Sequence, residues 1–145
     1  MNDLREWKEP GPMVVTEDGT LVSRLRIGRP DGYAIVVKAN NVTIQECDIA
    51  GAIVLYGAVS GITIRNNYIH DLKPSGTLEY VKQFAGIMTT EGDRWDNPIV
   101  QPMGAGDIEI RGNYFENCPT GAYLVECKGP IAFSGNFSKN HRGPF

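Results

Sequence analysis

Short runs of alternating apolar and polar residues recur along most of the chain. Four of these runs align with one another without gaps, and their first apolar positions are separated by 20, 46 and 23 residues. Alternation with a period of two is typical of β-strands that bury one face. The four runs are Asn41–Ile49, Gly61–Ile69, Asp107–Phe115 and Pro130–Ser138.

A second apolar strand is predicted before each run. Residues 34–38, 52–56 and 122–126 stand close to the runs that follow them, whereas 86–90 is separated from its run by residues 91–106. An insertion within one coil explains the long spacing of 46 residues better than a missing coil does. The repeating unit is therefore predicted to contain three strands joined by turns, and the third strand is the shortest.

A repeat of about 20–23 residues cannot bury its inner face alone, but repeats that stack as successive coils form a continuous core. The position after the second strand supports stacking, because an Asn amide there can hydrogen-bond the same group one coil away in an asparagine ladder. A leucine-rich repeat would need a Leu-x-x-Leu-x-Leu pattern, and a sandwich of short strands would not repeat Asn in register. We therefore predict an all-β, parallel β-helix of about five coils, with loop insertions at 73–85 and 91–106. The ladder positions are Cys47, Asn67, Asn113 and Asn136.

Segments such as Val42–Ile49 and Ile62–Ile69 resemble the coils of right-handed parallel β-helix repeat proteins. This pectate-lyase-like superfamily includes pectate lyases, polygalacturonases, alginate epimerases and phage tailspikes. The likeness covers residues 19–140, with 1–18 expected to form an N-terminal arm or cap and 141–145 a tail. The resemblance implies a polysaccharide-binding or polysaccharide-processing domain (lyase, hydrolase or epimerase-like) in an extracellular or periplasmic location. The alternative is a non-catalytic structural or assembly module.

Composition narrows the classes of partner. Fourteen Lys and Arg against seventeen Asp and Glu give a net charge of −3, whereas nucleic-acid-binding domains usually carry a concentrated basic face. The longest apolar run, 50–59, has about half the length that a membrane span needs. The first residues lack the apolar region of a signal peptide. We therefore expect neither a nucleic-acid partner nor a membrane partner.

The ends of the chain and its cysteines leave alternatives open. The last residues contain no evident capping element, so we expect either a longer natural chain or an end that a partner buries.

Three cysteines are too few for a disulfide scaffold. Cys118 and Cys127 can approach each other and form a disulfide, but free buried thiols are the simpler expectation.

One column of outward side chains is predicted to be apolar through four coils. An apolar stripe on the outside of a solenoid usually marks a partner or a covering loop. Either the insertions fold over it, or a second copy packs on it in a symmetric homodimer. The predicted interface residues are Val36, Val54, Met88 and Leu124.

Three other sets of outward side chains are candidates for binding a polysaccharide. Arg65 and Arg111 share a column and can grip the carboxylates of an acidic polysaccharide, unless they form a solvated face with Glu109 as counter-charge. A column of three rings can form a platform for sugars, or the rings can stabilise one another by stacking. The rings are Tyr68, Tyr114 and Phe137, and a further column beside the insertions consists of Lys38, Tyr56 and Glu126.

The sequence contains no strong catalytic motif, so the candidate catalytic groups are constellations of residues. Glu91, Asp93 and Asp96 in the second insertion can bind Ca²⁺ or supply an acid and a base for glycoside hydrolysis, unless they belong to a solvated loop. His70, beside Asp71 at a strand end, can act as a base in a lyase or an epimerase, unless the pair forms a surface turn. Calcium is the one candidate cofactor.

Overall fold

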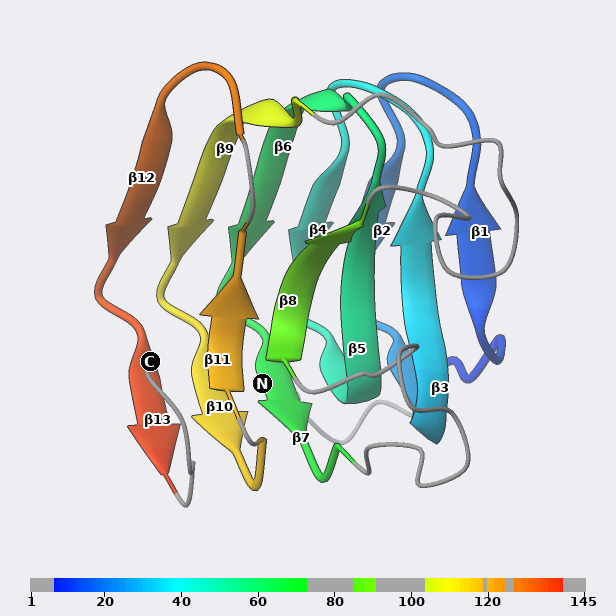
Figure 1. The fold of residues 1–145 in the computed structure, drawn as a ribbon. Helices are drawn as coiled ribbons and strands as arrows, with labels where there is room; N and C mark the ends of the chain where they lie inside the picture. Colours follow the sequence, from blue (N-terminus) through cyan, green and yellow to red (C-terminus); the bar gives the residue numbers. More distant parts are fainter. Residues whose placement is uncertain (1–6, 73–84, 91–103, 119, 125–126, 140–145) are drawn as a thin grey trace.

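The computed structural model describes residues 7–72, 85–90, 104–118, 120–124 and 127–139. These residues form strands joined by turns and loops (Figure 1), and they contain no helix that is long and apolar enough to cross a membrane. The strands are β1 (Met13–Val15), β2 (Leu21–Ser23), β3 (Arg26–Val37), β4 (Thr43–Gln45), β5 (Asp48–Tyr56), β6 (Ser60–Arg65), β7 (Tyr68–His70), β8 (Ala85–Thr90), β9 (Gly106–Arg111), β10 (Tyr114–Glu116), β11 (Thr120–Tyr123), β12 (Ile131–Ser134) and β13 (Phe137–Lys139).

The strands stack into a parallel β-solenoid. All strand pairs among the described residues are parallel, and they form one sheet of eight strands and one of five. The smaller sheet has the order β2–β4–β6–β9–β12, with one strand per coil, so about four turns separate its first strand from its last. The chain winds in a right-handed sense from β1 towards β12 (Figure 1). The predicted all-β, parallel β-helix is confirmed.

The larger sheet divides after β5. The first part of β5 pairs with β7, with Asp48 opposite Tyr68, and its last part pairs with β8, with Val54 opposite Met88. One branch continues through β7, β10 and β13, and the other joins β8 to β11. In β3 and β5 the third strand of one coil runs on into the first strand of the next, although the sequence predicted separate short strands. The branches separate where residues 73–84 intervene between β7 and β8.

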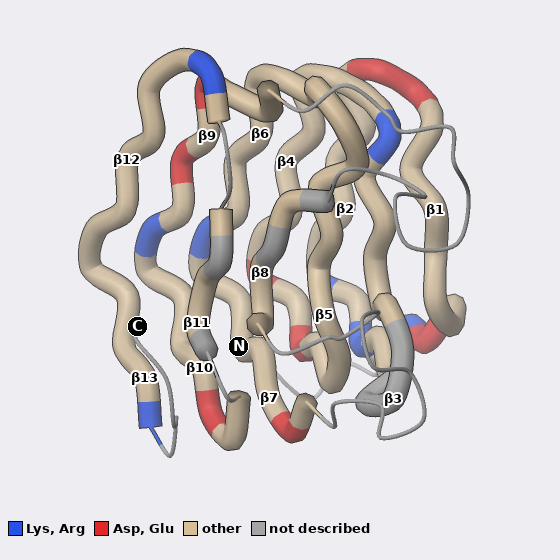
Figure 2. Tube along the Cα trace, viewed as in Figure 1, with Lys and Arg blue, Asp and Glu red and all other residues tan. Residues whose placement is uncertain are grey.

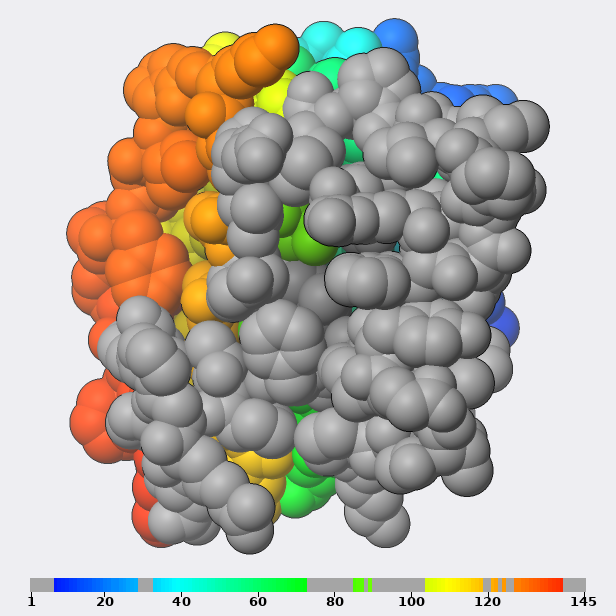
Figure 3. Space-filling model, viewed as in Figure 1, coloured from blue at the N-terminus to red at the C-terminus, as the bar shows by residue number. Residues whose placement is uncertain are grey.

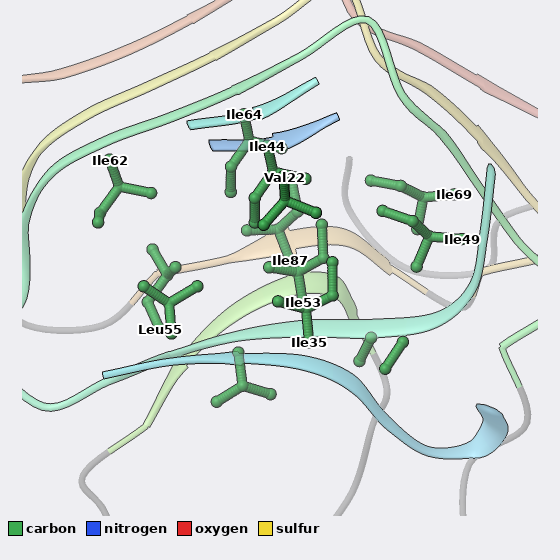
Figure 4. Packing of buried hydrophobic residues seen from close by; sticks show 14 of the residues in the cluster. Val22, Ile35, Ile44, Ile49, Ile53, Leu55, Ile62, Ile64, Ile69 and Ile87 are labelled. Atoms are coloured by element: carbon green, nitrogen blue, oxygen red, sulfur yellow. The ribbon is translucent and has the colours of Figure 1, made fainter. Parts of the chain in front are cut away.

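The core consists of aliphatic columns that run along the solenoid axis. Ile35, Ile53 and Ile87 lie in register on β3, β5 and β8, and Figure 4 shows them grouped inside the coil. Ile44 and Ile64 form a second column from β4 and β6. β-Branched side chains suit these positions because few rotamers are open to them and they pack well on a pleated sheet.

Three amides at the turn after the second strand form a hydrogen-bonded chain, here called the asparagine column (Asn67, Asn113 and Asn136). Asn67 and Asn113 are buried, and Asn136 is half-buried. Nδ2 of Asn67 donates to Oδ1 of Asn113, and Nδ2 of Asn113 donates to Oδ1 of Asn136, each at 3.0 Å. The same oxygens accept the backbone N–H groups of Asn67 and Asn113. Each Nδ2 also donates to a backbone carbonyl of the preceding coil, so the column links the backbones of successive coils.

The predicted apolar stripe is not a continuous exposed surface. Val54 is 1 % exposed and belongs to the hydrophobic core, while Val36 and Leu124 are half-buried. The side chain of Met88 lies outside the described residues. Every residue of β5 from Gly51 to Leu55 is buried, so Val54 is covered within the chain itself, and the packing of a second copy on this stripe stays a prediction. Parallel strands covered on both faces have such continuous apolar runs.

The segment boundaries differ slightly from those predicted. β1 lies within the predicted arm, 1–18, yet it pairs with β3 and belongs to the first coil. Ala85 and Gly106 begin β8 and β9, so these two residues are strand residues and not loop. The remainder of the two insertions and the 141–145 tail lie outside the described residues.

Candidate functional site

Aromatic and charged side chains gather on the outer face of the branch formed by β7, β10 and β13. Acidic residues lie at the ends of β7 and β10 (Figure 2). Side chains one coil apart face the same way because the strands are parallel and in register. The register therefore joins Arg26, Asp48, Tyr68, Tyr114 and Phe137 in one column.

The three predicted rings stack on one another. The ring centroids of Tyr68 and Tyr114 are 5.4 Å apart with an interplanar angle of 14°, and those of Tyr114 and Phe137 are 5.3 Å apart at 28°. His70 stacks on Tyr68 at 4.1 Å. Each ring therefore places part of its face against the ring of a neighbouring coil. Less ring surface is left for a ligand than in a row of rings that do not contact one another. Phe137, at the end of the column, is 60 % exposed.

The Tyr68 hydroxyl is fixed to the next coil. It donates a hydrogen bond of 2.6 Å to Oε1 of Glu116. This bond, followed by burial and the charges of Glu116 and Asp71, raises the pKa of Tyr68 well above its ordinary value. Tyr68 therefore stays protonated and acts as a rigid ring with a fixed orientation.

His70 lies between two carboxylates. Its Nε2 is 2.5 Å from Oδ1 of Asp48 in the preceding coil, and its Nδ1 is 2.8 Å from Oδ2 of Asp71. Asn117 donates to the other oxygen of Asp71. Burial lowers the pKa of His70, but the hydrogen bonds to Asp71 and Asp48 and their charges raise it by more, so the net pKa is above its ordinary value. In the protonated form, both ring nitrogens donate to these carboxylates. This arrangement stabilises a protonated imidazole and does not suit a base, which needs a nitrogen that can accept a proton.

Replacing His70 with glutamine is expected to remove a pH-dependent part of the free energy of unfolding. The pKa is higher in the folded protein than in the unfolded chain, so this stabilisation is complete below the unfolded pKa of about 6.5 and is lost as the pH rises through the folded pKa. Urea denaturation from about pH 5 to about pH 9 should show a wild-type advantage that shrinks with pH. The matched control is His141→Gln. An advantage that does not change with pH contradicts the assignment.

An open pocket of about 460 Å³ lies beside the ring column, where the second strands turn into the third. Trp7, from the segment before β1, lines the pocket together with Tyr68 of β7 and Tyr114 of β10. Glu46, Asp48, Asn66 and Asn67 add polar groups to its wall. The pocket thus combines aromatic surface with hydrogen-bonding groups from successive coils.

The sharp turn between the second and third strands explains why polar groups project into the pocket. Glu46, Asn66 and Gly112 occupy the same turn position in three coils, with φ of 54°, 57° and 68°. Non-glycine residues rarely adopt this left-handed conformation, and Asn does so most readily. At Gly112 the positive φ favours glycine, and a Cβ there would also require the Asn66 side chain to move.

The two pocket carboxylates differ in their environments. Asp48 is held by Arg26, whose Nε is 3.4 Å from Oδ2, as well as by His70. Glu46 is 4.0 Å from Arg24, and the side chains of both residues are about half exposed. The Arg26 guanidinium also lies 5.4 Å from the centroid of the Trp7 ring. Asp48 is therefore a fixed wall group, whereas Glu46 is accessible to a ligand.

Arg65 and Arg111 lie on the other sheet, at the ends of β6 and β9, and do not line this pocket. They are in register on β6 and β9, but Nε and Nη2 of Arg65 both donate to Oε1 of Gln45, at 2.9 and 2.7 Å. Nε of Arg111 is 2.6 Å from Oε2 of Glu109. Glu109 is therefore the counter-charge of Arg111, as one of the two predicted alternatives had it.

The remaining predicted residues are only partly described. Nζ of Lys38 lies 4.5 Å from the centroid of the Tyr56 ring, so the structure brings these two together. Glu126 of the same column and the acidic trio Glu91, Asp93 and Asp96 lie outside the described residues. Within the described ranges, no group of three His, Cys, Asp or Glu residues has the geometry of a metal site.

The three cysteines are in the reduced form. Cys47, Cys118 and Cys127 form no disulfide, so the pair Cys118–Cys127 is not bridged. Burial raises the pKa of the Cys118 thiol to about 11 and also raises the pKa of Cys47. Thiols with a raised pKa are poor nucleophiles at neutral pH.

Sequence reasoning missed several residues of the pocket. Asp48 occupies the position in its repeat that Tyr68 occupies in the next one, and this equivalence was the available signal. Glu46 and Asn66 stand at equivalent places in the repeat and were detectable in the same way. Trp7 lies outside the repeat. It reaches the pocket because the backbone of Lys8 pairs with Leu25, which no periodicity indicates.

The site can bind a ligand that has both apolar faces and hydrogen-bond donors. The fold is a parallel β-solenoid. Comparison of the chain with family models, curated proteins and solved structures gives no match.

Proposed function

We propose that this β-solenoid binds a polysaccharide in the pocket beside the ring column. The observation that carries the proposal is the combination of Trp7, Tyr68 and Tyr114 with the accessible carboxylate of Glu46 around one open pocket. Ligand sites typically combine aromatic walls with a few polar groups that fix orientation. A sugar ring matches both, because its C–H groups contact aromatic surface and its hydroxyl groups donate to carboxylate and amide oxygens.

Charge favours a neutral polysaccharide in this pocket. Glu46 and Asp48 are hydrogen-bond acceptors there, and hydrogen bonds from hydroxyl groups to carboxylates are short and strong. A uronic acid would bring like charge to the same wall. The acidic polysaccharide expected from Arg65 and Arg111 would instead bind the other sheet and compete with Gln45 and Glu109 for their donors.

The proposed activity is binding and not cleavage. Glycoside hydrolysis needs two carboxyl groups, one on each side of the scissile bond, with separate roles as acid and as base or nucleophile. Asp48 already interacts with both Arg26 and His70, and it positions the imidazole ring. Its carboxylate therefore serves the stability of neighbouring coils.

Trp7→Ala and Glu46→Gln are expected to weaken binding of a neutral oligosaccharide. Loss of a ring from a ligand contact typically costs enough to reduce affinity by about tenfold or more. A glycan array identifies the sugar, and titration calorimetry compares the variants. Leu21→Ala and Glu109→Gln are the matched controls, because both residues lie on the other sheet and should leave the affinity unchanged.

Two outcomes contradict this proposal. One is retention of acidic sugars alone, with binding lost in Arg65→Ala and Arg111→Ala and kept in Trp7→Ala. The other is an array on which no sugar is retained. The second outcome favours a structural or assembly module, for which the exposed last coil is the specific observation.

A further inference from the structure

His70 contacts two residues that line the pocket but does not itself line it. Its Nε2 is 2.5 Å from Oδ1 of Asp48, in the preceding coil. Its ring stacks on that of Tyr68, with the centroids 4.1 Å apart and an angle of 15° between the ring planes. Asp48 and Tyr68 both belong to the pocket wall. The position of one wall carboxylate and of one wall ring therefore depends on the imidazole of His70.

Three carboxylates from three successive coils surround this imidazole. Asp48 belongs to the preceding coil, Asp71 follows His70 in the chain, and Glu116 of β10 is in register with His70. In Figure 3 the atoms of β7 and β10, coloured green and yellow, reach the surface at the lower edge of the molecule. The His70 side chain is 16 % exposed, so its protons can exchange with solvent. Among the described residues, the charged and titratable groups around the imidazole, directly or through Asp48 and Tyr68, are Arg26, Asp48, Tyr68, Asp71 and Glu116.

The loss of one proton breaks this arrangement. A protonated imidazole donates from both nitrogens, whereas a neutral imidazole has one N–H and one lone pair. Asp71 is adjacent in the chain, so its contact with Nδ1 requires less ordering than a contact between coils. Asp48 keeps a second cationic partner, because Nε of Arg26 lies 3.4 Å from its Oδ2. The remaining proton is therefore expected on Nδ1, which leaves the lone pair of Nε2 facing the Asp48 carboxylate and repelling it.

We infer that His70 is a positioning residue, which holds Asp48 and Tyr68 in the binding arrangement of the pocket while the imidazole is protonated and releases Asp48 when it is neutral. The inference rests on the proposed polysaccharide site. Burial lowers the pKa of His70, but the hydrogen bonds to Asp71 and Asp48 and their charges raise it by more, so the net pKa is above its ordinary value. Affinity is therefore complete below this pKa and falls as the pH rises through it. Linkage also requires that a bound ligand raise the pKa of His70 further.

Titration calorimetry with a neutral oligosaccharide identified on the glycan array tests this inference. Between about pH 6 and about pH 9, the wild-type affinity should fall by about fivefold or more, in the range usual for coupled sites. Buffers with different ionisation enthalpies should show that binding takes up protons near the midpoint of this fall. His70→Gln should remove the pH dependence, whereas His141→Gln, at the other histidine of the chain, should keep it.

Asp71→Asn is the conservative variant that separates a proton-dependent role from a structural one. The oxygen of its amide can accept the hydrogen bond that Asn117 donates to Asp71, and the nitrogen can donate to Nδ1 of His70. The single proton of the neutral imidazole then lies on Nε2 and faces Asp48. Asn also tolerates the φ of 54° at this position. The variant should therefore retain at about pH 9 most of the affinity that it has at about pH 6.

Nuclear magnetic resonance of the ligand-free protein separates failure of this inference from failure of the proposed function. The imidazole nitrogens of His70 report its protonation and tautomer, while the Trp7 indole N–H and the Asn66 side-chain amide report the pocket. The two pocket signals should change with the His70 midpoint in the wild type and not in His70→Gln. If they do so while no sugar binds at any pH, the polysaccharide proposal fails and the positioning role stands. Pocket signals that do not follow His70, or an affinity that is equal at about pH 6 and about pH 9, overturn the inference.

Discussion

Asn113→Leu is expected to lower the free energy of unfolding by about 3 kcal/mol or more, because it leaves at least two buried backbone groups without partners. Oδ1 of Asn113 accepts the backbone N–H of Asn67, and its Nδ2 donates to the carbonyl of Ile64. Asn113 is buried, so water does not replace these bonds. Urea denaturation, with the slope compared as well as the midpoint, measures the loss.

Asn136→Leu is the matched control for this prediction. It removes the same kind of amide from the same column, but Asn136 itself is only half-buried, so the hydrogen bonds of its side chain are less shielded from water than those of Asn113. The loss of stability should therefore be smaller than for Asn113→Leu. Equal losses, or an unchanged midpoint for Asn113→Leu, would mean that the column does not join the coils as its hydrogen bonds indicate.

Phe115→Ala is expected to destabilise the protein by about 3–5 kcal/mol, the usual cost of a large aromatic cavity in a core. Phe115 on β10 is fully buried and packs beside Gly86 on β8 and Ile69 on β7. It thus fills the space where the two branches of the larger sheet have separated. Urea denaturation with circular dichroism measures the change, and Val14→Ala, at an exposed position, is the control.

Gly86 provides an independent check on this packing. A Cβ at Gly86 would lie 2.9 Å from two ring carbons of Phe115 and 3.0 Å from Cγ2 of Ile69. Gly86→Ala should therefore be destabilising in the wild type and much less so in a Phe115→Leu background, where the shorter side chain leaves room. Such neighbouring substitutions are expected to be non-additive. Additive losses would contradict the contact.

The sequence contained enough information to predict the solenoid. Period-two alternation is local, and the recurrence of Asn67, Asn113 and Asn136 at one position of the repeat identifies where coils meet. The burial of Val54 was harder to predict. Its strand is apolar on both sides, so alternation gave no basis for distinguishing an exposed face from a second buried one.

The candidate site was predictable only where it follows the repeat. The ring column of Tyr68, Tyr114 and Phe137 follows directly from the register. The bond between His70 and Asp48 runs diagonally between coils, and it depends on rotamers that a sequence does not reveal. Trp7 enters the pocket from outside the repeat, next to the bridge between Lys8 and Leu25, and no periodicity of the sequence indicates that bridge.

The most direct measurement of the central claim is chemical-shift mapping of the labelled protein during titration with neutral oligosaccharides. Binding in the pocket predicts saturating shifts of the Trp7 indole N–H, the Asn66 side-chain amide and the backbone amides of Glu46 and Tyr68. The Arg65 and Arg111 side-chain signals on the other sheet should stay unchanged. Shifts confined to that sheet, or no saturating shifts at millimolar sugar, would contradict polysaccharide binding at this pocket.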